Sequence, residues 1–353
     1  MLPNVSVIIA AYNEEKNIAK CIDSLINQQY ENIEVIIVDD GSTDGTANIL
    51  SKYSTFNNVK VISIENAGVS NARNIGLQHV TGSWIMFADA DDYYNSGAIL
   101  ALVTTAEKTK CKVVQGGLRR GQEIEKINSH EFVHIFDSKV VAKVLLDYDA
   151  HISDEYKMYD RHMRLSTHGP YGKIFSKEII TDNNISFDTD MGLGEDLLFY
   201  FKVLNSVDQI AIYENDVYVV QENPHSSTRK FNIKMPEYAV TFSNRIIEYM
   251  KSSGIHEDYK NNIHYQIYMH IMVGIKCCYL HVDNNQNDYV KAKELRKFIE
   301  FSVFQEAIEQ NNKISTNWLS YSKLMIWLLA KKSTYLYVKL FKLRKWIREG
   351  IKK

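Results

Sequence analysis

An apolar run that ends in a cluster of aspartates is the feature that most constrains this chain. Residues 84–88 are apolar or aromatic, and Asp89, Ala90, Asp91 and Asp92 follow them directly. The pattern predicts a buried strand that carries carboxylates to its carboxyl end, where open α/β sheets bind ligands. Because strand side chains alternate, Asp89 and Asp91 fall on one face. Such oxygen ligands suit Mg²⁺ or Mn²⁺, and an acidic turn before the next helix is the plainer alternative.

The residues before this cluster alternate short apolar runs with helical patterns. Predicted strands cover residues 5–10, 33–38 and 59–64, and predicted helices follow near residues 18–26, 46–50 and 69–80. Repeated strand–helix–strand units imply a mostly parallel sheet with helices on both faces, so the predicted class is α/β and Rossmann-like. The carboxyl ends of parallel strands share one edge, which places the residues after each strand near the aspartates.

Several other classes lose support from what the sequence lacks. Neither the G-x-G-x-x-G nor the G-x-x-x-x-G-K-[ST] pattern occurs, so dehydrogenases and P-loop hydrolases are disfavoured. The four cysteines are too few and too scattered for a disulfide framework, and the adjacent Cys277 and Cys278 are interpreted as helix core.

A set of motifs in fixed order carries a resemblance to a known family. The motifs are Tyr12-Asn13-Glu14 after the first strand, Asp39-Asp40 with residues 41–44 after the second, residues 66–76, Asp89-Ala90-Asp91, and Gly194-Glu195-Asp196. Together they resemble the family 2 inverting glycosyltransferases of the GT-A fold. The resemblance covers about residues 4–230 and continues through Lys173 and residues 217–220.

The resemblance implies transfer of a sugar from a UDP-sugar to an acceptor hydroxyl. Asp196 is then the candidate general base, with Glu195 as a supporting carboxylate. Asp91, helped by Asp89, is the candidate ligand of Mn²⁺ or Mg²⁺. The implied donor site comprises Ala11, Tyr12, Asn13, Glu14, Asp39, Asp40, Asn66, Gly68, Arg73, Asp89, Ala90 and Asp91.

Each assignment has a plainer alternative. Asp196 is also a good N-cap for a helix over residues 197–204. Arg73 is a bidentate phosphate donor in the functional interpretation and a solvated helix residue otherwise. Tyr12 is a stacking ring for uracil in the functional interpretation and a packed strand-end residue otherwise. Asp39 or Asp40 is a hydrogen-bond acceptor for the base or an ordinary turn residue.

Two positions depart from the family's pattern. Ala11 stands where the family often has proline, which changes loop stiffness more than chemistry. Residues 221–228 replace a more basic segment of the family. The candidate donors to the diphosphate from this loop are therefore His225, Ser227 and Arg229. Lys173 is a further candidate on the acceptor side.

The predicted organisation is a catalytic domain over residues 1–231 and a helical region over 232–353. The catalytic domain divides into a nucleotide-sugar half (1–115) and an acceptor half (116–231). In the helical region Ile263, Ile267, Ile271 and Ile275 recur every fourth residue, which predicts a buried helix face. An oligomer contact is the alternative, so a homo-oligomer stays open.

The end of the chain is basic and aromatic. Residues 323–353 hold ten Lys or Arg and one Glu, a net +9 within a chain of net −2. No apolar span approaches the ~20 residues that cross a bilayer. We expect an interfacial amphipathic helix that binds anionic membranes; a packed helix with a solvated basic face is the alternative. No nucleic-acid motif accompanies the charge. Without a predicted signal peptide, we expect a peripheral protein on the cytoplasmic face of the membrane.

The predicted function is therefore an inverting glycosyltransferase that modifies a glycan or lipid-linked glycan in cell-surface polysaccharide synthesis. A nucleotidyltransferase shares the sheet and the metal but has no need of Asp196. A non-catalytic nucleotide-sugar-binding module at the membrane would bind without turnover.

Overall fold

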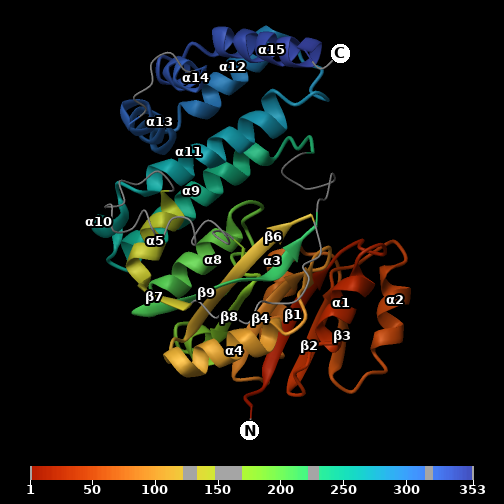
Figure 1. Ribbon diagram of the computed structural model, residues 1–353. Coiled ribbons are helices and arrows are strands. Elements are labelled where there is room, and N and C mark those ends of the chain that lie inside the picture. Colours follow the sequence, from red (N-terminus) through yellow and green to blue (C-terminus); the bar gives the residue numbers. More distant parts are fainter. Residues whose placement is uncertain (1, 122–132, 148–168, 222–229, 315–320, 352–353) are drawn as a thin grey trace. The chain divides into compact units, whose positions relative to one another are not determined.

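The computed structural model describes residues 2–121, 133–147, 169–221, 230–314 and 321–351 (Figure 1). The chain forms two compact units. The first comprises most residues up to 223, and the second runs from 224 to 353 and also takes residues 190–194. Sequence patterns place the boundary at residue 232 instead, and nothing in them predicts the contribution of 190–194.

A nine-stranded sheet forms the centre of the first unit, in the order β3-β2-β1-β4-β8-β6-β9-β5 with β7 paired to β9. The strands are β1 (Val5–Ala11), β2 (Ile33–Asp39), β3 (Val59–Ser63), β4 (Trp84–Asp89), β5 (Tyr93–Tyr94), β6 (Val113–Arg120), β7 (Val133–Asp137), β8 (Lys173–Ser176) and β9 (Gln209–Val220). The pairs among β1 to β4 are parallel, as predicted, whereas β8 pairs antiparallel with both β4 and β6. The α/β class is confirmed.

Helices cover both faces of this sheet. They are α1 (Ile18–Ile26), α2 (Thr46–Tyr53), α3 (Val69–Gln78), α4 (Ala98–Thr109), α5 (Ser138–Leu146), α7 (Lys177–Asp182) and α8 (Glu195–Leu204). One core joins Val7 and Ile9 of β1 to Ile22 of α1 and Leu102 of α4. The alternate residue Ile8 faces the other way, which follows from the two-residue period of a strand.

On that second face, α3 approaches β1 closely. A Cβ placed on Gly76 of α3 would lie 2.4 Å from Cγ2 of Ile8, so a residue without a side chain is needed there. Beside it, the ring of Phe87 in β4 packs edge-on against Phe187 and Phe199, and Phe199 belongs to α8. This packing brings the start of α8 to the face that α3 occupies, and so positions the site.

The second unit is helical. Its elements are α9 (Met235–Ser252), α10 (His256–Tyr259), α11 (Ile263–Gly274), a π-helical turn (Ile275–Tyr279), α12 (Asp288–Ile299), α13 (Ser302–Ile314), α14 (Tyr321–Ala330) and α15 (Thr334–Ile351). The four isoleucines of the predicted helix face are at most 2% exposed, which confirms that they are core. All four cysteines of the chain are buried and free of disulfides.

The basic end of the chain forms two helices, α14 and α15, in place of one. Leu328 and Leu329 of α14 and Tyr337 and Val338 of α15 are at most 1% exposed, so part of their apolar surface packs within the unit. Other apolar residues face outward, and Trp346 is 72% exposed. Within the described residues, no helix combines the length and apolar character that a bilayer crossing requires.

Candidate active site

The carboxyl ends of β1, β2 and β4 meet at one edge of the sheet (Figure 1). In the parallel register Ala11 lies opposite Asp39, and Ala10 lies opposite Asp89. Ala11 is buried, whereas Tyr12, the next residue, is 48% exposed. Three motifs that are far apart in the sequence therefore share this edge, as the strand pattern predicts.

The loop after β1 is held against the loop after β2. Asn13 adopts a left-handed conformation with φ of +55°, which asparagine tolerates better than most residues. Its N–H donates to Ser42 Oγ (3.0 Å), and its Oδ1 accepts from the N–H of Thr43 (2.7 Å). The N–H of Glu14 donates to Thr46 Oγ1 (2.8 Å). These bonds fix the backbone that carries the exposed Tyr12.

The carboxylate of Asp40 ties β2 to the start of α3. It accepts from the N–H groups of Ala67 (2.8 Å) and Gly68 (2.9 Å), and Asn66 Nδ2 donates to the carbonyl of Asp40 (2.9 Å). Gly68, with φ of +91°, precedes α3 in a conformation that favours glycine. Asp40 thus shapes the site through the backbone of residues 66–68, a role that the sequence did not indicate. The predicted contact with a nucleobase stays a prediction for Asp39 and Asp40.

Arg73 of α3 lies at the centre of the site. Its side chain is 5% exposed, and its guanidinium donates to Asp89 Oδ1 (2.9 Å) and to Asp196 Oδ1 (2.6 Å). An oxygen of Glu195 lies 3.8 Å from the same guanidinium. The structure therefore joins the end of β4 to the start of α8 through one buried cation, whereas the sequence assigned Arg73 to phosphate binding.

The two candidate catalytic carboxylates lie within the first turn of α8. This helix begins at Glu195, so Asp196 sits inside it and binds Arg73, and the N-cap alternative does not hold. Burial raises the pKa of Asp196, and Arg73 opposes the rise. Burial and the neighbouring Asp196 raise the pKa of Glu195 as well. Both groups are thus better proton acceptors than a solvated carboxylate when they are ionised.

Negative charge accumulates around the predicted metal motif. Burial raises the pKa of Glu14, and Asp91, Asp44 and Asp89 add to that rise. Ala90 is buried between Asp89 and Asp91. Carboxylates repelling one another at a strand end are a donor set that suits a hard divalent cation. Even so, no group of three or more His, Cys, Asp or Glu in the described ranges is arranged to hold a metal by itself.

The structure adds three residues that the predicted site did not include. Asp92 is buried and accepts from the N–H of Gln221 (2.8 Å), and Gln221 Nε2 also donates to the carbonyl of Asp91. Tyr218 Oη accepts from the N–H of Asp89 (2.9 Å). Together these contacts fasten the end of β9 to the aspartate cluster. The position of Asp92 directly after the Asp89-Ala90-Asp91 motif was a signal in the sequence, but nothing in the sequence indicates that Gln221 is its partner.

Lys173, the candidate on the acceptor side, is fully buried in β8. Its ammonium donates to the carbonyl of Gly169 (2.6 Å) and lies 4.5 Å from the ring centroid of Tyr200. Burial lowers the pKa of Lys173 to about 7, and Asp196 opposes that change. The other loop candidates, His225, Ser227 and Arg229, lie outside the described residues.

Replacing this lysine tests its burial. With a folded pKa near 7 and an unfolded pKa near 10.5, the unfolded chain holds the extra proton between these values. Lys173 therefore makes stability rise with pH across that window. We expect Lys173→Met to lose this rise. In urea unfolding, the free energy of unfolding of wild type should therefore increase relative to that of the variant from pH 7 to pH 9.5. The exposed Lys112→Met is the control. Parallel curves for wild type and Lys173→Met would show that Lys173 is hydrated and charged.

Known proteins are similar to this chain in sequence. Residues 6–165 match the model of the family described as glycosyl transferase family 2. The uncharacterized glycosyltransferase EpsJ of Bacillus subtilis is 25% identical over 343 residues, which are 97% of this chain and 96% of EpsJ. The similarity to EpsJ therefore extends over nearly the whole of both chains.

A second relative is the poly(ribitol-phosphate) beta-glucosyltransferase of Bacillus spizizenii. It is 29% identical over 236 residues, which are 63% of this chain but 33% of that protein, so this chain matches about a third of its length.

The fold is similar to that of a solved structure, S. aureus TarS 1–349. The likeness covers 98% of this chain and 92% of TarS 1–349, with a TM-score of 0.60 at 20% identity. The family match, the relatives and the shared architecture together show that the chain carries a glycosyl transferase family 2 domain, matched over residues 6–165, and that it has the GT-A fold.

Proposed function

We propose that this chain is an inverting glycosyltransferase that moves a sugar from a UDP-sugar to a hydroxyl of a glycan or lipid-linked glycan during cell-surface polysaccharide synthesis. Two findings support the substrates. A relative is named for glucosyl transfer to poly(ribitol-phosphate). TarS 1–349 is known in complex with UDP-GlcNAc, a structure similar to this chain at a TM-score of 0.57 and 19% identity.

One observation carries the mechanism: buried Arg73 links Asp89, in the motif at the end of β4, to Asp196 of α8. In-line displacement at an anomeric carbon needs a proton acceptor on the side of the incoming hydroxyl. It also needs charge neutralisation on the side of the departing diphosphate. The Arg73 contacts set these two parts of the site at fixed positions on either side of one guanidinium.

Asp196 takes the acceptor's proton in this proposal. Its side chain is 26% exposed, so it is open to a substrate while Arg73 holds one of its oxygens. The raised pKa strengthens it as a base, and the bond from Arg73 opposes the rise and so favours the ionised form. Asp89 shares Arg73 and so couples the orientation of the base to the donor edge of the sheet.

Asp91 and Asp89 would hold a divalent cation, Mn²⁺ or Mg²⁺. The carboxylate donors fit such an ion, and donor phosphate oxygens and water would complete its coordination. When bound, the cation would neutralise and orient the leaving diphosphate. Asp89 also accepts from Arg73, so Asp91 is the ligand that carries most of this proposal.

Removing Asp91 tests the cation. We expect Asp91→Ala to weaken cation-dependent binding of a UDP-sugar by about tenfold or more and to stop turnover, because the diphosphate loses its neutralising ion. Calorimetry with and without Mn²⁺ measures the binding, and the remote Asp182→Ala is the control. EDTA-treated wild type that turns over donor at the untreated rate would contradict the metal assignment.

A panel of nucleotide sugars scored for release of UDP tests the reaction class. Release of UDP with a glycosylated product supports the proposal. Release of pyrophosphate would identify a nucleotidyltransferase, and donor binding without turnover would identify a non-catalytic binding module. We place the enzyme at the cytoplasmic face of the membrane, as a peripheral protein, because a lipid-linked acceptor would be held there.

A further inference from the structure

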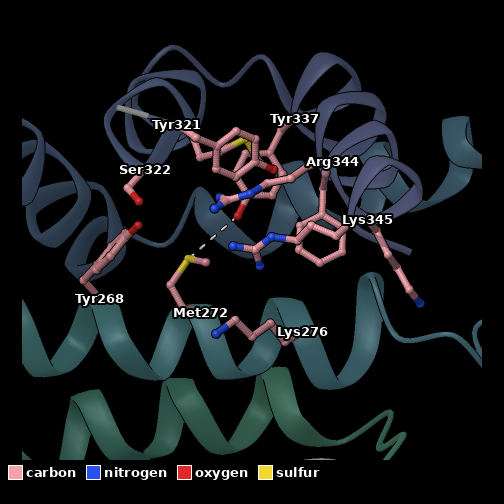
Figure 2. A pocket seen from close by; sticks show the side chains of 11 residues that line it. Tyr268, Met272, Lys276, Tyr321, Ser322, Tyr337, Arg344 and Lys345 are labelled. Carbon is pink, nitrogen blue, oxygen red and sulfur yellow. Dashed lines mark hydrogen bonds between the residues drawn. The ribbon is translucent and has the colours of Figure 1, made fainter. Parts of the chain in front are cut away.

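A cavity of about 820 Å³ lies within the helical unit, between α11, α14, α15 and the π-helical turn (Figure 2). In Figure 2, Tyr268, Met272 and Lys276 follow one helix face, as their spacing of four residues requires, with α14 and α15 on the other side. Much of the wall is aromatic or apolar, and the residues concerned are Tyr268, Met272, Tyr321, Met325, Tyr337 and Phe341.

Four cations also line this cavity, and no Asp or Glu is among the lining residues that the structure describes. They are Lys276, Arg344, Lys345 and Arg348. The Arg344 guanidinium lies 3.9 Å from the ring centroid of Tyr321, which holds it over the pocket wall. Arg344 and Arg348 are one helical turn apart, where like charges repel. The cavity therefore concentrates positive charge beside an apolar wall.

Other basic residues of α15 differ from these in their partners. Lys339 lies 2.8 Å from Asp288 Oδ2, and Lys342 contacts the same carboxylate, so both are compensated within the unit. In contrast, neither Lys276, Arg344 nor Arg348 has an ion pair with a carboxylate anywhere in the described part of the chain. An anionic ligand in the cavity would supply the missing counter-charge.

An exposed apolar stripe runs along α15 next to the cavity-lining face. Leu336, Leu343 and Ile347 are 49%, 50% and 45% exposed. At 3.6 residues per turn they lie beside the face that carries Tyr337, Arg344 and its neighbours. A soluble phosphate or nucleotide would leave such an apolar stripe exposed to water, whereas the apolar chain of an amphiphile would cover it.

We propose that this cavity binds the phosphate headgroup of an anionic membrane amphiphile. Arg344, Arg348 and Lys276 contact the phosphate, and the apolar chain lies against the aromatic wall and the stripe of Leu336, Leu343 and Ile347. The site would hold the chain at a lipid surface through recognition of one headgroup, in addition to general attraction by basic residues.

The test compares two variants with equal loss of charge. Full-length Arg344→Gln/Arg348→Gln removes cavity cations, and Lys339→Gln/Lys342→Gln removes compensated lysines from the same helix. We expect binding to phosphatidylglycerol-containing vesicles to fall at least tenfold for the first and no more than about threefold for the second. Neither variant should change the rate of UDP-sugar hydrolysis. The result of this test is therefore independent of the proposed function.

Each other outcome overturns the inference. An equal loss of vesicle binding in both variants would show general electrostatic attraction and no specific binding site. Binding to phosphatidylcholine vesicles as tight as to anionic ones would exclude recognition of an anionic headgroup. Release of the protein from anionic vesicles by millimolar inorganic phosphate or UDP at constant ionic strength would identify a soluble ligand. If the arginine variant unfolds by circular dichroism, Lys276→Gln, at an exposed position, replaces it, and unchanged binding then rejects the site.

Discussion

Asp196→Asn is expected to lower sugar transfer by a factor of about 10²–10⁴ while affinity for the donor stays nearly unchanged. Asparagine keeps the shape of the side chain and can still accept a hydrogen bond from Arg73, but it cannot take the acceptor's proton. Isothermal calorimetry measures donor affinity, and initial rates of transfer measure the chemistry. The matched control is Glu195→Gln, in which the neighbouring carboxylate, 3.8 Å from Arg73, is removed instead.

The pH profile separates a base from a structural carboxylate. A base works in its ionised form, so transfer must be lost as pH falls through the folded pKa of Asp196. Because burial raises that pKa, the acidic limb of kcat/KM should lie above the pH expected for a solvated aspartate. Asp196→Asn should abolish this limb in the residual activity. A limb that persists in Asp196→Asn and disappears in Glu195→Gln would move the base to Glu195.

Arg73→Met is expected to destabilise the first unit by about 3 kcal/mol, the low end for breaking a buried ion pair from one side. Three carboxylates lose their shared cation, but Asp89 and Asp196 are 32% and 26% exposed, so water offsets part of the cost. Without Arg73 the pKa values of Asp196 and Glu195 should rise further, which would move the acidic limb of transfer to higher pH.

A surface arginine of the helical unit provides the matched control. Arg245 also contacts two carboxylates, Asp190 at 2.7 Å and Glu248 at 3.4 Å, but both are about 70% exposed. Arg245→Met should therefore cost less than about 1 kcal/mol. Urea unfolding measures both variants. A loss for Arg73→Met as small as that for Arg245→Met, with an unshifted pH profile, would show that Arg73 does not hold the site together. Arg73→Lys should fall between, because one ammonium cannot donate to two carboxylates in the same planar geometry.

The local part of this architecture follows from the sequence. Runs such as residues 33–38 have the length and apolar character of buried strands, and parallel pairing then brings their carboxyl ends to one edge. Asp39 and Asp89 reach that edge because each comes last in its strand, so a sequence pattern suffices to place them. The buried isoleucine face of α11 was equally predictable from its spacing.

The pairing of charges was not predictable in the same way. Arg73 and Asp196 are separated by 123 residues, and their contact depends on how α3 and α8 pack on the sheet through Gly76 and Phe199. A sequence shows that a residue carries charge but not which distant group neutralises it. For that reason it suggested a phosphate ligand for Arg73, where tertiary packing supplies carboxylates.

The basic end of the chain shows the same division. Its net charge and aromatic content are visible in the sequence, and they predict affinity for an anionic surface. Only the tertiary structure folds it into α14 and α15, buries Leu328 and Tyr337, and gives Lys339 a partner in Asp288 while Arg344 lines a cavity. Composition fixes the sum of the charges, whereas long-range packing of helices decides which charges are compensated and which line a cavity.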